Sequence, residues 1–319
     1  MSYQPCYSIV DLTVSLAEAT RPRGINNAGH VVGHTQRQFD EEQAFVWRDG
    51  ATHMLGCPPE RRSIAVAIND DDVIAGSTLL GEATGKACMW LDGRFVDLSD
   101  SSPVSCSASA INSIGQIVGT VINFNSLTSS HRPKISAFLY SHGVMRELSV
   151  EDETNSAATG INDHGTIVGH AYGKRIPEQQ AVLWDRGLAE YMFPGHATGV
   201  NARGQAIGYN NTSPSGSRAF LWQQGELIKL GVPNNFDAAT AQPLGINRDG
   251  QIVGAVSNPG TGVERACLWR EDKSYDLNAL ISAAERWILQ LAIAINDCGQ
   301  IVGEGIHKRR QSAFLLNPI

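Results

Sequence analysis

The chain has 319 residues, of which 42% are hydrophobic and 18% are charged, and its formal net charge is −7. This composition supports a large core and excludes a disordered chain, and the acidic balance excludes the basic footprint of a nucleic-acid-binding protein. No stretch approaches the ~20 consecutive apolar residues of a membrane span, and the first residues lack the basic and apolar regions of a signal peptide. We therefore expect a cytoplasmic protein with neither nucleic-acid nor membrane partners, and the short basic clusters at 61–62 and 308–310 are typical of solvated loops.

The first element expected along the chain is a strand in YSIVDLT, residues 7–13. A ten-residue motif then recurs seven times, and GINDHGTIVG at residues 160–169 is a typical copy. The spacing between its asparagines averages 45 residues, a period typical of propeller blades or helical arrays. The repeated asparagines are Asn26, Asn69, Asn112, Asn162, Asn201, Asn247 and Asn296.

Each repeat predicts four short strands, because its apolar segments are rich in β-branched and aromatic residues and end at Gly, Asn or Asp. The first strand ends in Gly/Ala-Ile-Asn, and the following Asn-x-x-Gly predicts a tight hairpin turn whose glycine takes a positive φ. The second strand is QIVG or a variant, the third resembles AFVW at 44–47, and the fourth resembles FVDLS at 95–99. Only residues 277–291 have a pattern typical of a helix. The tryptophans that recur in the third strand are expected in the core: Trp47, Trp90, Trp184, Trp222 and Trp269.

Four antiparallel strands repeated radially predict an all-β fold, a seven-bladed β-propeller that spans residues 1–319 as a single domain. The chain ends in FLLNPI, after the third strand of the seventh repeat, so that repeat lacks a fourth strand. The N-terminal strand at 7–13 matches the missing one. We therefore expect it to complete the last blade and close the ring.

The repeats resemble the HAF-repeat proteins, a bacterial family of probable extracellular repeats named for a His-Ala-Phe in the third strand. The stretches that carry the resemblance are GINDHGTIVG, AFLW, WILQLAIAINDCGQIVGEG and the closing AFLLNP, and the resemblance covers essentially the whole chain. It implies a repeat fold of the propeller kind and an extracellular location, and it implies no particular activity. The histidine of the family motif is replaced before Ala-Phe by Gln43, Ser136, Arg218 and Ser312.

Standard catalytic signatures are absent: the chain has no G-x-S-x-G elbow and no H-E-x-x-H. GEATGKA at 81–87 lacks the spacing of a P-loop and lies between strands. NDDD at 69–72 offers oxygen ligands for Ca²⁺, but it takes the place of an Asn-x-x-Gly turn, so we expect a plain turn. We predict no bound metal and no cofactor.

The six cysteines show no C-x-x-C pair and no ligand spacing. Cys88 and Cys267 stand where other repeats carry Phe or Val, so we expect them to be buried. Cys57 and Cys106 are expected in connecting loops, either as reactive thiols or as ordinary free cysteines.

Loop length favours one end of the ring as the functional face. The turns between first and second strands are nearly invariant, whereas the connections at the opposite end vary in length and composition. Variable loops on a rigid scaffold are where binding and catalysis usually occur. We therefore place the candidate site on the variable face, around the mouth of the central channel.

One position in the repeat, the residue directly after the glycine of the second strand, carries chemically reactive side chains in several copies and is expected at this mouth. Ring closure makes the first and seventh blades neighbours, so Glu304 is predicted to approach His34, with His170 across the channel. A His–Glu pair provides a general base or two metal ligands, and ordinary polar residues at a wet channel mouth are the alternative. Arg21 and Arg23 are candidates for gripping a carboxylate or phosphate. The remaining candidate ligand-binding residues are Thr120, Tyr209 and Trp287.

Two functions remain open from these residues. We favour a binding module that presents the variable face to a peptide, a protein or a small molecule. The alternative is an enzyme, a lyase, isomerase, cyclase or hydrolase, in which a His/Glu base and arginine electrostatics act at the channel mouth. Trp287, which breaks the tryptophan register in the connection before the seventh blade, is either a plug between blades or an aromatic wall for a ligand.

Overall fold

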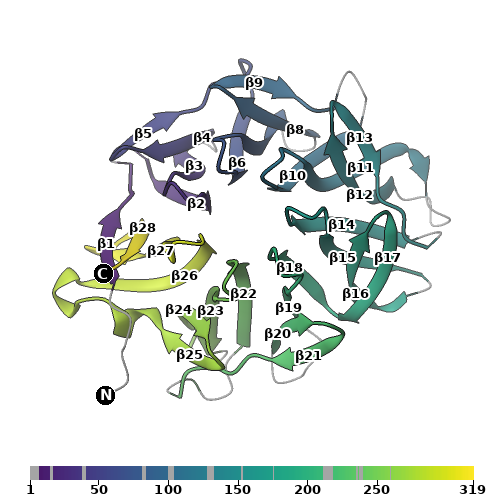
Figure 1. Ribbon diagram of the computed structural model, residues 1–319. Helices are drawn as coiled ribbons and strands as arrows, with labels where there is room; N and C mark the ends of the chain where they lie inside the picture. Colours follow the sequence, from purple (N-terminus) through teal and green to yellow (C-terminus); the bar gives the residue numbers. More distant parts are fainter. Residues whose placement is uncertain are drawn as a thin grey trace.

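A computed structural model describes residues 7–14, 17–37, 41–80, 84–99, 104–127, 133–151, 154–174, 176–210, 218–234, 236, 240–258 and 260–319. Its strands form seven four-stranded antiparallel sheets arranged as blades around a central axis (Figure 1). This confirms the predicted seven-bladed propeller. Among the described residues, no helix has the length and apolar character needed to cross a membrane.

Within blades 1 to 6 the strands follow chain order from the centre outward. Blades 1 and 2 contain β2 (Ala19–Ile25), β3 (Val31–Arg37), β4 (Glu41–Arg48), β5 (Ala51–Met54), β6 (Arg62–Ile68), β7 (Ile74–Leu80), β8 (Thr84–Leu91) and β9 (Arg94–Asp97). Blades 3 and 4 contain β10 (Ser105–Ile111), β11 (Ile117–Leu127), β12 (Pro133–Ser141), β13 (Val144–Glu147), β14 (Thr154–Ile161), β15 (Ile167–Gly173), β16 (Ile176–Asp185) and β17 (Leu188–Pro194). Blades 5 and 6 contain β18 (His196–Val200), β19 (Ala206–Asn210), β20 (Arg218–Gln223), β21 (Glu226–Lys229), β22 (Thr240–Ile246), β23 (Ile252–Asn258), β24 (Val263–Arg270) and β25 (Lys273–Asp276).

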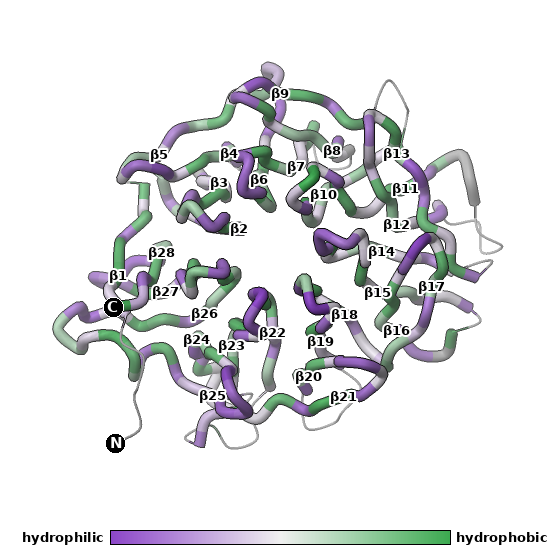
Figure 2. The backbone as a smooth tube through the Cα atoms, in the orientation of Figure 1, coloured by the Kyte–Doolittle hydropathy of each residue, from purple (hydrophilic) through white to green (hydrophobic). Residues whose placement is uncertain are grey.

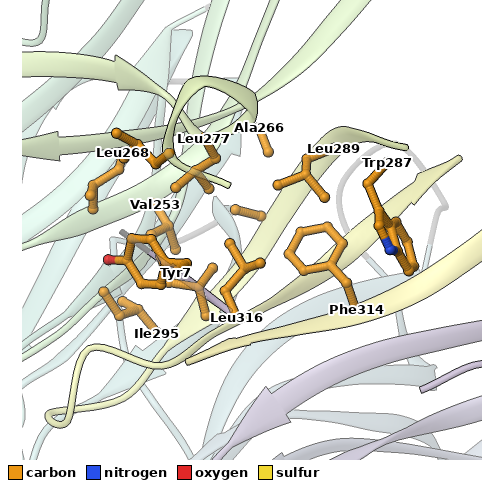
Figure 3. Packing of buried hydrophobic residues seen from close by; sticks show 13 residues of the cluster. Tyr7, Val253, Ala266, Leu268, Leu277, Trp287, Leu289, Ile295, Phe314 and Leu316 are labelled. Carbon is orange, nitrogen blue, oxygen red and sulfur yellow. The ribbon is translucent and has the colours of Figure 1, made fainter. Parts of the chain in front are cut away.

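Blade 7 is built from both ends of the chain. Its inner strands are β26 (Trp287–Ile295), β27 (Ile301–His307) and β28 (Arg310–Pro318), and its outermost strand is β1 (Tyr7–Asp11). β1 runs antiparallel to β28, with Tyr7 opposite Pro318. Tyr7 is buried in a cluster that also contains Leu268 of blade 6 (Figure 3). The N-terminal strand therefore closes the ring, as the sequence predicts.

The segment at residues 277–291, whose sequence is typical of a helix, is only partly helical. Two short 3-10 turns, η1 (Leu277–Leu280) and η2 (Ala283–Glu285), precede β26. The Asn278 amide donates to the Leu289 carbonyl at 2.9 Å and accepts from the Leu289 N–H at 2.7 Å, which ties the connection to β26. Trp287, expected in the connection, is the first residue of β26.

The repeated asparagines form a closed ring of hydrogen bonds. Each side-chain oxygen accepts the N–H four residues later, as in Thr166 N to Asn162 Oδ1 at 2.9 Å, which fixes the local turn as expected. Each side-chain nitrogen also donates to the main-chain oxygen of the asparagine in the next blade, a contact that the sequence did not reveal. These bonds run from Asn26 to Asn69, Asn112, Asn162, Asn201, Asn247, Asn296 and back to Asn26. Figure 2 shows the turns as hydrophilic segments near the centre of the ring.

Each second strand also contains a glycine, and the physical reason for it differs from the reason for the turn glycine. Every innermost strand has an irregularity of the bulge type three residues before its asparagine, as between Ala158 and Gly160. At Gly169 a Cβ would collide with the main-chain oxygen of Ala157 on that strand. The close approach of the two backbones therefore requires glycine at this position.

The turn of blade 2 departs from the repeat. Asp72 takes the place of the turn glycine with a φ of 57°, and its N–H donates to the Asn69 oxygen at 3.2 Å, which confirms a turn at residues 69–72. Its carboxylate accepts from the Asn26 amide at 2.9 Å and lies 2.7 Å from His30 Nδ1. The aspartate thus bridges blades 1 and 2 in a position where only the turn conformation was expected.

The core lies between neighbouring blades. Trp90, Trp184 and Trp269 are buried, as expected, whereas Trp47 and Trp222 are half-buried. Cys88 and Cys267 are buried too, and burial raises the pKa of each thiol. Cys57 lies in a connection after β5, as expected. Cys106 does not lie in a loop: it is buried in β10, where its sulfur accepts from the Ala87 N–H at 3.2 Å, because that strand starts earlier than its sequence suggests.

Candidate functional site

The residues predicted at the channel mouth lie on equivalent rungs of the blades. In each blade, the residue after the second strand's glycine pairs with the first-strand residue five positions before the asparagine, as His34 pairs with Arg21. An ion pair and a ring contact each join two neighbouring rungs across a blade boundary. One contact joins Glu304 of blade 7 to Arg21 of blade 1, and the other joins His170 of blade 4 to His196 of blade 5.

Glu304 forms an ion pair with Arg21 rather than with His34. The Arg21 Nη1 lies 3.2 Å from the Glu304 Oε2, and Glu304 is only 7% exposed. Burial raises the pKa of this carboxyl group, while the Arg21 and Arg23 charges oppose the rise. The pair bridges blades 7 and 1, so the carboxylate predicted to orient His34 has a different partner.

His34 is buried, with 3% of its surface exposed. Its Nδ1 has no hydrogen-bond partner among the described residues, and its Nε2 lies 4.0 Å from the Glu42 Oε1. Burial lowers the pKa of His34 to about 4, helped by the positive charges of Arg23 and Arg21. The imidazole is therefore neutral at pH 7 and closed off from solvent.

His170 belongs to a separate aromatic group at the boundary of blades 4 and 5. The His170 and His196 ring centroids are 4.7 Å apart, and Tyr209 stacks on His196 at 5.2 Å. Burial lowers the pKa of His170 to about 4, with a further contribution from His196. In Figure 1 blade 4 lies across the ring from blades 7 and 1, so His170 is on the far side as predicted, but its contacts are with blade 5.

Thr120 and Arg23 occupy the remaining predicted positions. Thr120 is half-buried on β11, opposite Ser107. Arg23 is the residue at the irregularity of β2 and is exposed. Its side chain makes no hydrogen bond or ion pair with a described residue, so its charge remains available beside the Glu304–Arg21 pair.

Trp287 is a core residue of blade 7. It is 8% exposed, its ring stacks on His307 with centroids 4.4 Å apart, and it meets Phe314 edge-on (Figure 3). The Nδ1 of His307 in turn lies 2.9 Å from the Asp11 carboxylate on the N-terminal strand. Of the two expected roles, Trp287 therefore has the structural one, and it fixes the position of His307.

A cavity of about 610 Å³ opens beside His307. It lies between the η2–β26 connection and the β27–β28 hairpin, both of which belong to the variable face. We call it the blade-7 cavity. Its lining residues are Ala284, Glu285, Arg286, Ile288, Ile306, His307, Lys308 and Arg309.

The lining of the blade-7 cavity was missed from the sequence. In the sequence, residues 308–310 are typical of a solvated basic cluster, and no motif marks Arg286. The available signal was a run of cations in an acidic chain, close to the irregular connection before Trp287. That signal does not by itself tell a solvated loop from a cavity wall.

A smaller cavity of about 190 Å³ lies on the axis at the opposite end of the channel. Several asparagines of the ring line it, together with aliphatic residues such as Ile25 and Ile246 and the carboxylates of Asp70, Asp163 and Asp297. In the described part of the chain, no group of three or more histidine, cysteine or carboxylate side chains has a metal-binding arrangement.

Comparison with known proteins supports the fold alone. No family model and no curated protein matches the sequence. The β-propeller domain of the Trilobed protease from Pyrococcus furiosus matches at 11% identity with a TM-score of 0.63, covering 95% of this chain and 94% of that one. Pyrococcus horikoshii acylaminoacyl peptidase matches at 12% identity and a TM-score of 0.61, with 95% of this chain and 52% of that chain covered. YCF48 bound to D1 peptide matches at 12% identity and a TM-score of 0.55, with coverages of 100% and 96%.

These likenesses and the closed ring define the class: the chain is a seven-bladed β-propeller. It spans about half the length of the peptidases that it matches. The Trilobed protease domain is described as having an open velcro topology, whereas here β1 pairs with β28.

Proposed function

We propose that this propeller is a binding module that recognises a peptide, a protein or a small molecule with its variable face. The observation that carries the proposal is the blade-7 cavity of about 610 Å³, a volume within the usual range of ligand sites. Both segments that form it are anchored, one by the Asn278–Leu289 hydrogen bonds and the other by the Asp11–His307 contact. A preformed site of this kind loses little conformational entropy on binding.

The candidate catalytic groups favour binding over catalysis. An efficient general base at neutral pH has a pKa close to 7 and reaches the substrate. His34 has a pKa of about 4 and is 3% exposed, and Glu304 is engaged by Arg21. The Glu304–Arg21 pair is better suited to holding blades 7 and 1 together.

The comparisons fit the same proposal without extending it. YCF48, which matches this chain with a TM-score of 0.55, is described as bound to D1 peptide, so peptide recognition is compatible with a related fold. The sequence also resembles the HAF-repeat family. That resemblance implies no particular activity, which is compatible with a binding module.

The test is an array of short peptides of defined sequence, followed by hydrogen exchange with each peptide that binds. We expect slower exchange at residues 283–288 and 306–310, because a ligand in the cavity covers these segments. Protection confined to the turns around the asparagine ring, or no binding by any peptide, protein or small-molecule probe, would overturn the proposal.

An enzyme is the second candidate, and one observation favours it. Glu304 and His34 are buried titratable groups beside Arg21, and the pKa values of Glu304 and His34 are shifted, a feature often found at active sites. Glu304→Gln removes the negative charge while keeping the shape. If the chain has a hydrolase, lyase or isomerase activity and that activity falls at least tenfold in this variant, the result supports catalysis at Glu304. Unchanged activity in the variant rules out a catalytic role for Glu304.

A further inference from the structure

We propose that the blade-7 cavity binds an acidic peptide segment that carries an apolar side chain next to its carboxylates. This inference rests on the proposed binding function and names its ligand. It follows from three features of the cavity: positive charge without partners among the described residues, an apolar strip beside the charges, and a rigid wall.

The positive charges come from two separate segments. Lys308 and Arg309 form the two-residue turn between β27 and β28, with φ values of 50° and 65°, so both cations stand at the tip of the hairpin. Arg286 lies across from them at the start of β26. These three cations and one carboxylate, Glu285, line the cavity in a chain whose net charge is −7.

The three side chains also lack partners. None of Arg286, Lys308 and Arg309 makes a side-chain hydrogen bond or ion pair with a described residue. Some other surface arginines of this propeller are paired, as Arg248 is with Asp297 at 3.3 Å and Arg203 with Asp249 at 3.1 Å. Guanidinium and ammonium groups without internal partners form their strongest contacts with carboxylates or phosphates.

An apolar strip lies beside the charges. Ile288 and Ile306 are opposite each other on β26 and β27, and Ile288 is 41% exposed. Burying such side chains against an apolar ligand group contributes roughly 25 cal/mol per Å² of apolar surface. An inorganic anion would satisfy the cations but leave this strip uncovered, so the observations favour a peptide that supplies both kinds of group.

The wall is held rigid from behind. His307 is fixed between the Trp287 ring, at 4.4 Å, and the Asp11 carboxylate, at 2.9 Å. Asp11 is partly buried, which raises its pKa, but hydrogen bonds from Thr13 and His307 outweigh burial and lower the pKa overall. The carboxylate therefore stays charged at neutral pH, and ligand binding does not require the hairpin to be rearranged.

The test uses three fluorescein-labelled probes: Glu-Leu-Glu-Leu-Asp-Leu, the same peptide with Gln and Asn in place of the acids, and one with lysines. Anisotropy titrations are made with the full chain at low and physiological salt, and hydrogen exchange locates each bound peptide. We expect the acidic peptide to bind at least tenfold more tightly than the neutral one and more weakly as salt rises.

The variant is Arg286→Ala, Lys308→Asn, Arg309→Gly, because Asn-Gly preserves the turn conformation while removing the charge. The matched control is Arg94→Ala with Arg146→Ala, two exposed arginines on the outer strands of blades 2 and 3. We expect at least a tenfold loss of acidic-peptide affinity in the variant and no change in the control. Melting curves that superimpose on the wild type show that both are folded.

Three other outcomes of these measurements would each contradict a particular part of the proposal. Equal binding of acidic and neutral peptides, with protection at 283–288 and 306–310, overturns the ligand class and leaves the proposed function standing. Complete displacement of the acidic peptide by millimolar inorganic phosphate, with equal protection by phosphate alone, overturns the peptide and leaves a simple anion site. Binding of the acidic peptide with protection only at the asparagine turns overturns both the inference and the proposed function.

Discussion

Each repeated asparagine satisfies two sets of main-chain groups at once. In blade 4 the Asn162 oxygen accepts the N–H groups of His164 and Thr166, and its nitrogen donates to the Asn201 oxygen of blade 5 at 3.0 Å. Asn162 is only 5% exposed, so each of these bonds replaces one with water. A local turn residue thereby becomes a link between blades.

Asn162→Asp separates these two roles. Aspartate keeps the oxygen that accepts within the turn but loses the N–H that donates to Asn201. We expect a loss of roughly 1–3 kcal/mol in the free energy of unfolding, because a buried carbonyl loses its partner. Urea denaturation measures this, with exposed His164→Ala as control. Wild-type stability in the aspartate variant would mean that the asparagine acts only in its turn.

His34 predicts a pH-dependent stability. Its folded pKa is about 4, below its ordinary value, because of burial and the charges of Arg23 and Arg21. In the unfolded chain His34 binds a proton below pH ~6.5, whereas in the folded chain it does so only near pH 4, so stability falls as the pH drops through this window. The shift corresponds to roughly 3 kcal/mol.

His34→Leu removes this dependence. We expect the difference in unfolding free energy between pH 7 and pH 4 to be smaller in the variant than in the wild type by roughly 3 kcal/mol. Exposed His142→Ala is the control and keeps the wild-type slope. Equal slopes in wild type and His34→Leu would show that His34 titrates normally in the folded chain.

At the scale of the element, the N-terminal strand matters more than its length suggests. β1 has five residues and sits at the outer edge of blade 7, yet Tyr7 is 6% exposed and belongs to the cluster between blades 6 and 7. Burial raises the pKa of the Tyr7 hydroxyl, with a smaller opposing effect from Arg270. The strand therefore contributes side-chain packing as well as main-chain pairing to ring closure.

Tyr7→Ala tests this contribution. Removing a buried aromatic ring costs about 3–5 kcal/mol, so we expect a loss in that range by urea denaturation, together with faster amide exchange in β28. Ser8→Ala on the same strand is the control, because Ser8 is exposed and its hydroxyl only contacts the Asn317 oxygen at 3.4 Å. Similar stabilities for the two variants would show that β1 pairs without anchoring the blade.

For the whole molecule, the ring is closed by a blade that contains both chain ends. Every boundary between blades is spanned by the chain, and the β1–β28 ladder ties the two chain ends into one blade. The asparagine ring adds a hydrogen bond across every boundary. Closure of this kind makes the seven blades one mechanical unit, on which a rigid variable face can be built.

Circular permutation tests the β1–β28 pairing that closes the ring, which we call the clasp. Tyr7 is opposite Pro318, so a short Gly-Ser linker can join the ends. New termini at residues 59 and 60, between blades 1 and 2, leave that boundary with neither a covalent link nor a shared sheet, and we expect a lower melting temperature and a broader transition. New termini between Lys308 and Arg309 keep both chain ends within blade 7 and serve as the control, with a melting temperature closer to the wild type. Equal melting temperatures for the two permutants would mean that the clasp is dispensable.

The sequence alone was sufficient to predict the architecture. Strand alternation and Asn-x-x-Gly turns are local signals, and their sevenfold repetition lets each copy support the others. Even ring closure was predictable, because the seventh repeat lacks a fourth strand and residues 7–13 match it. The role of the second-strand glycine was not predictable, because it depends on how closely an irregular first strand approaches it, as Ala157 approaches Gly169.

The candidate site was decided by the tertiary structure. Cyclic order correctly made blades 7 and 1 neighbours, but only side-chain packing determined that Glu304 reaches Arg21 instead of His34. Likewise, Arg286 and Lys308 line one cavity because the connection before β26 folds against the β27–β28 hairpin. Repeats encode a scaffold through interactions between near neighbours in the chain, whereas a site depends on unrepeated residues meeting within a few ångströms, which only the folded chain determines.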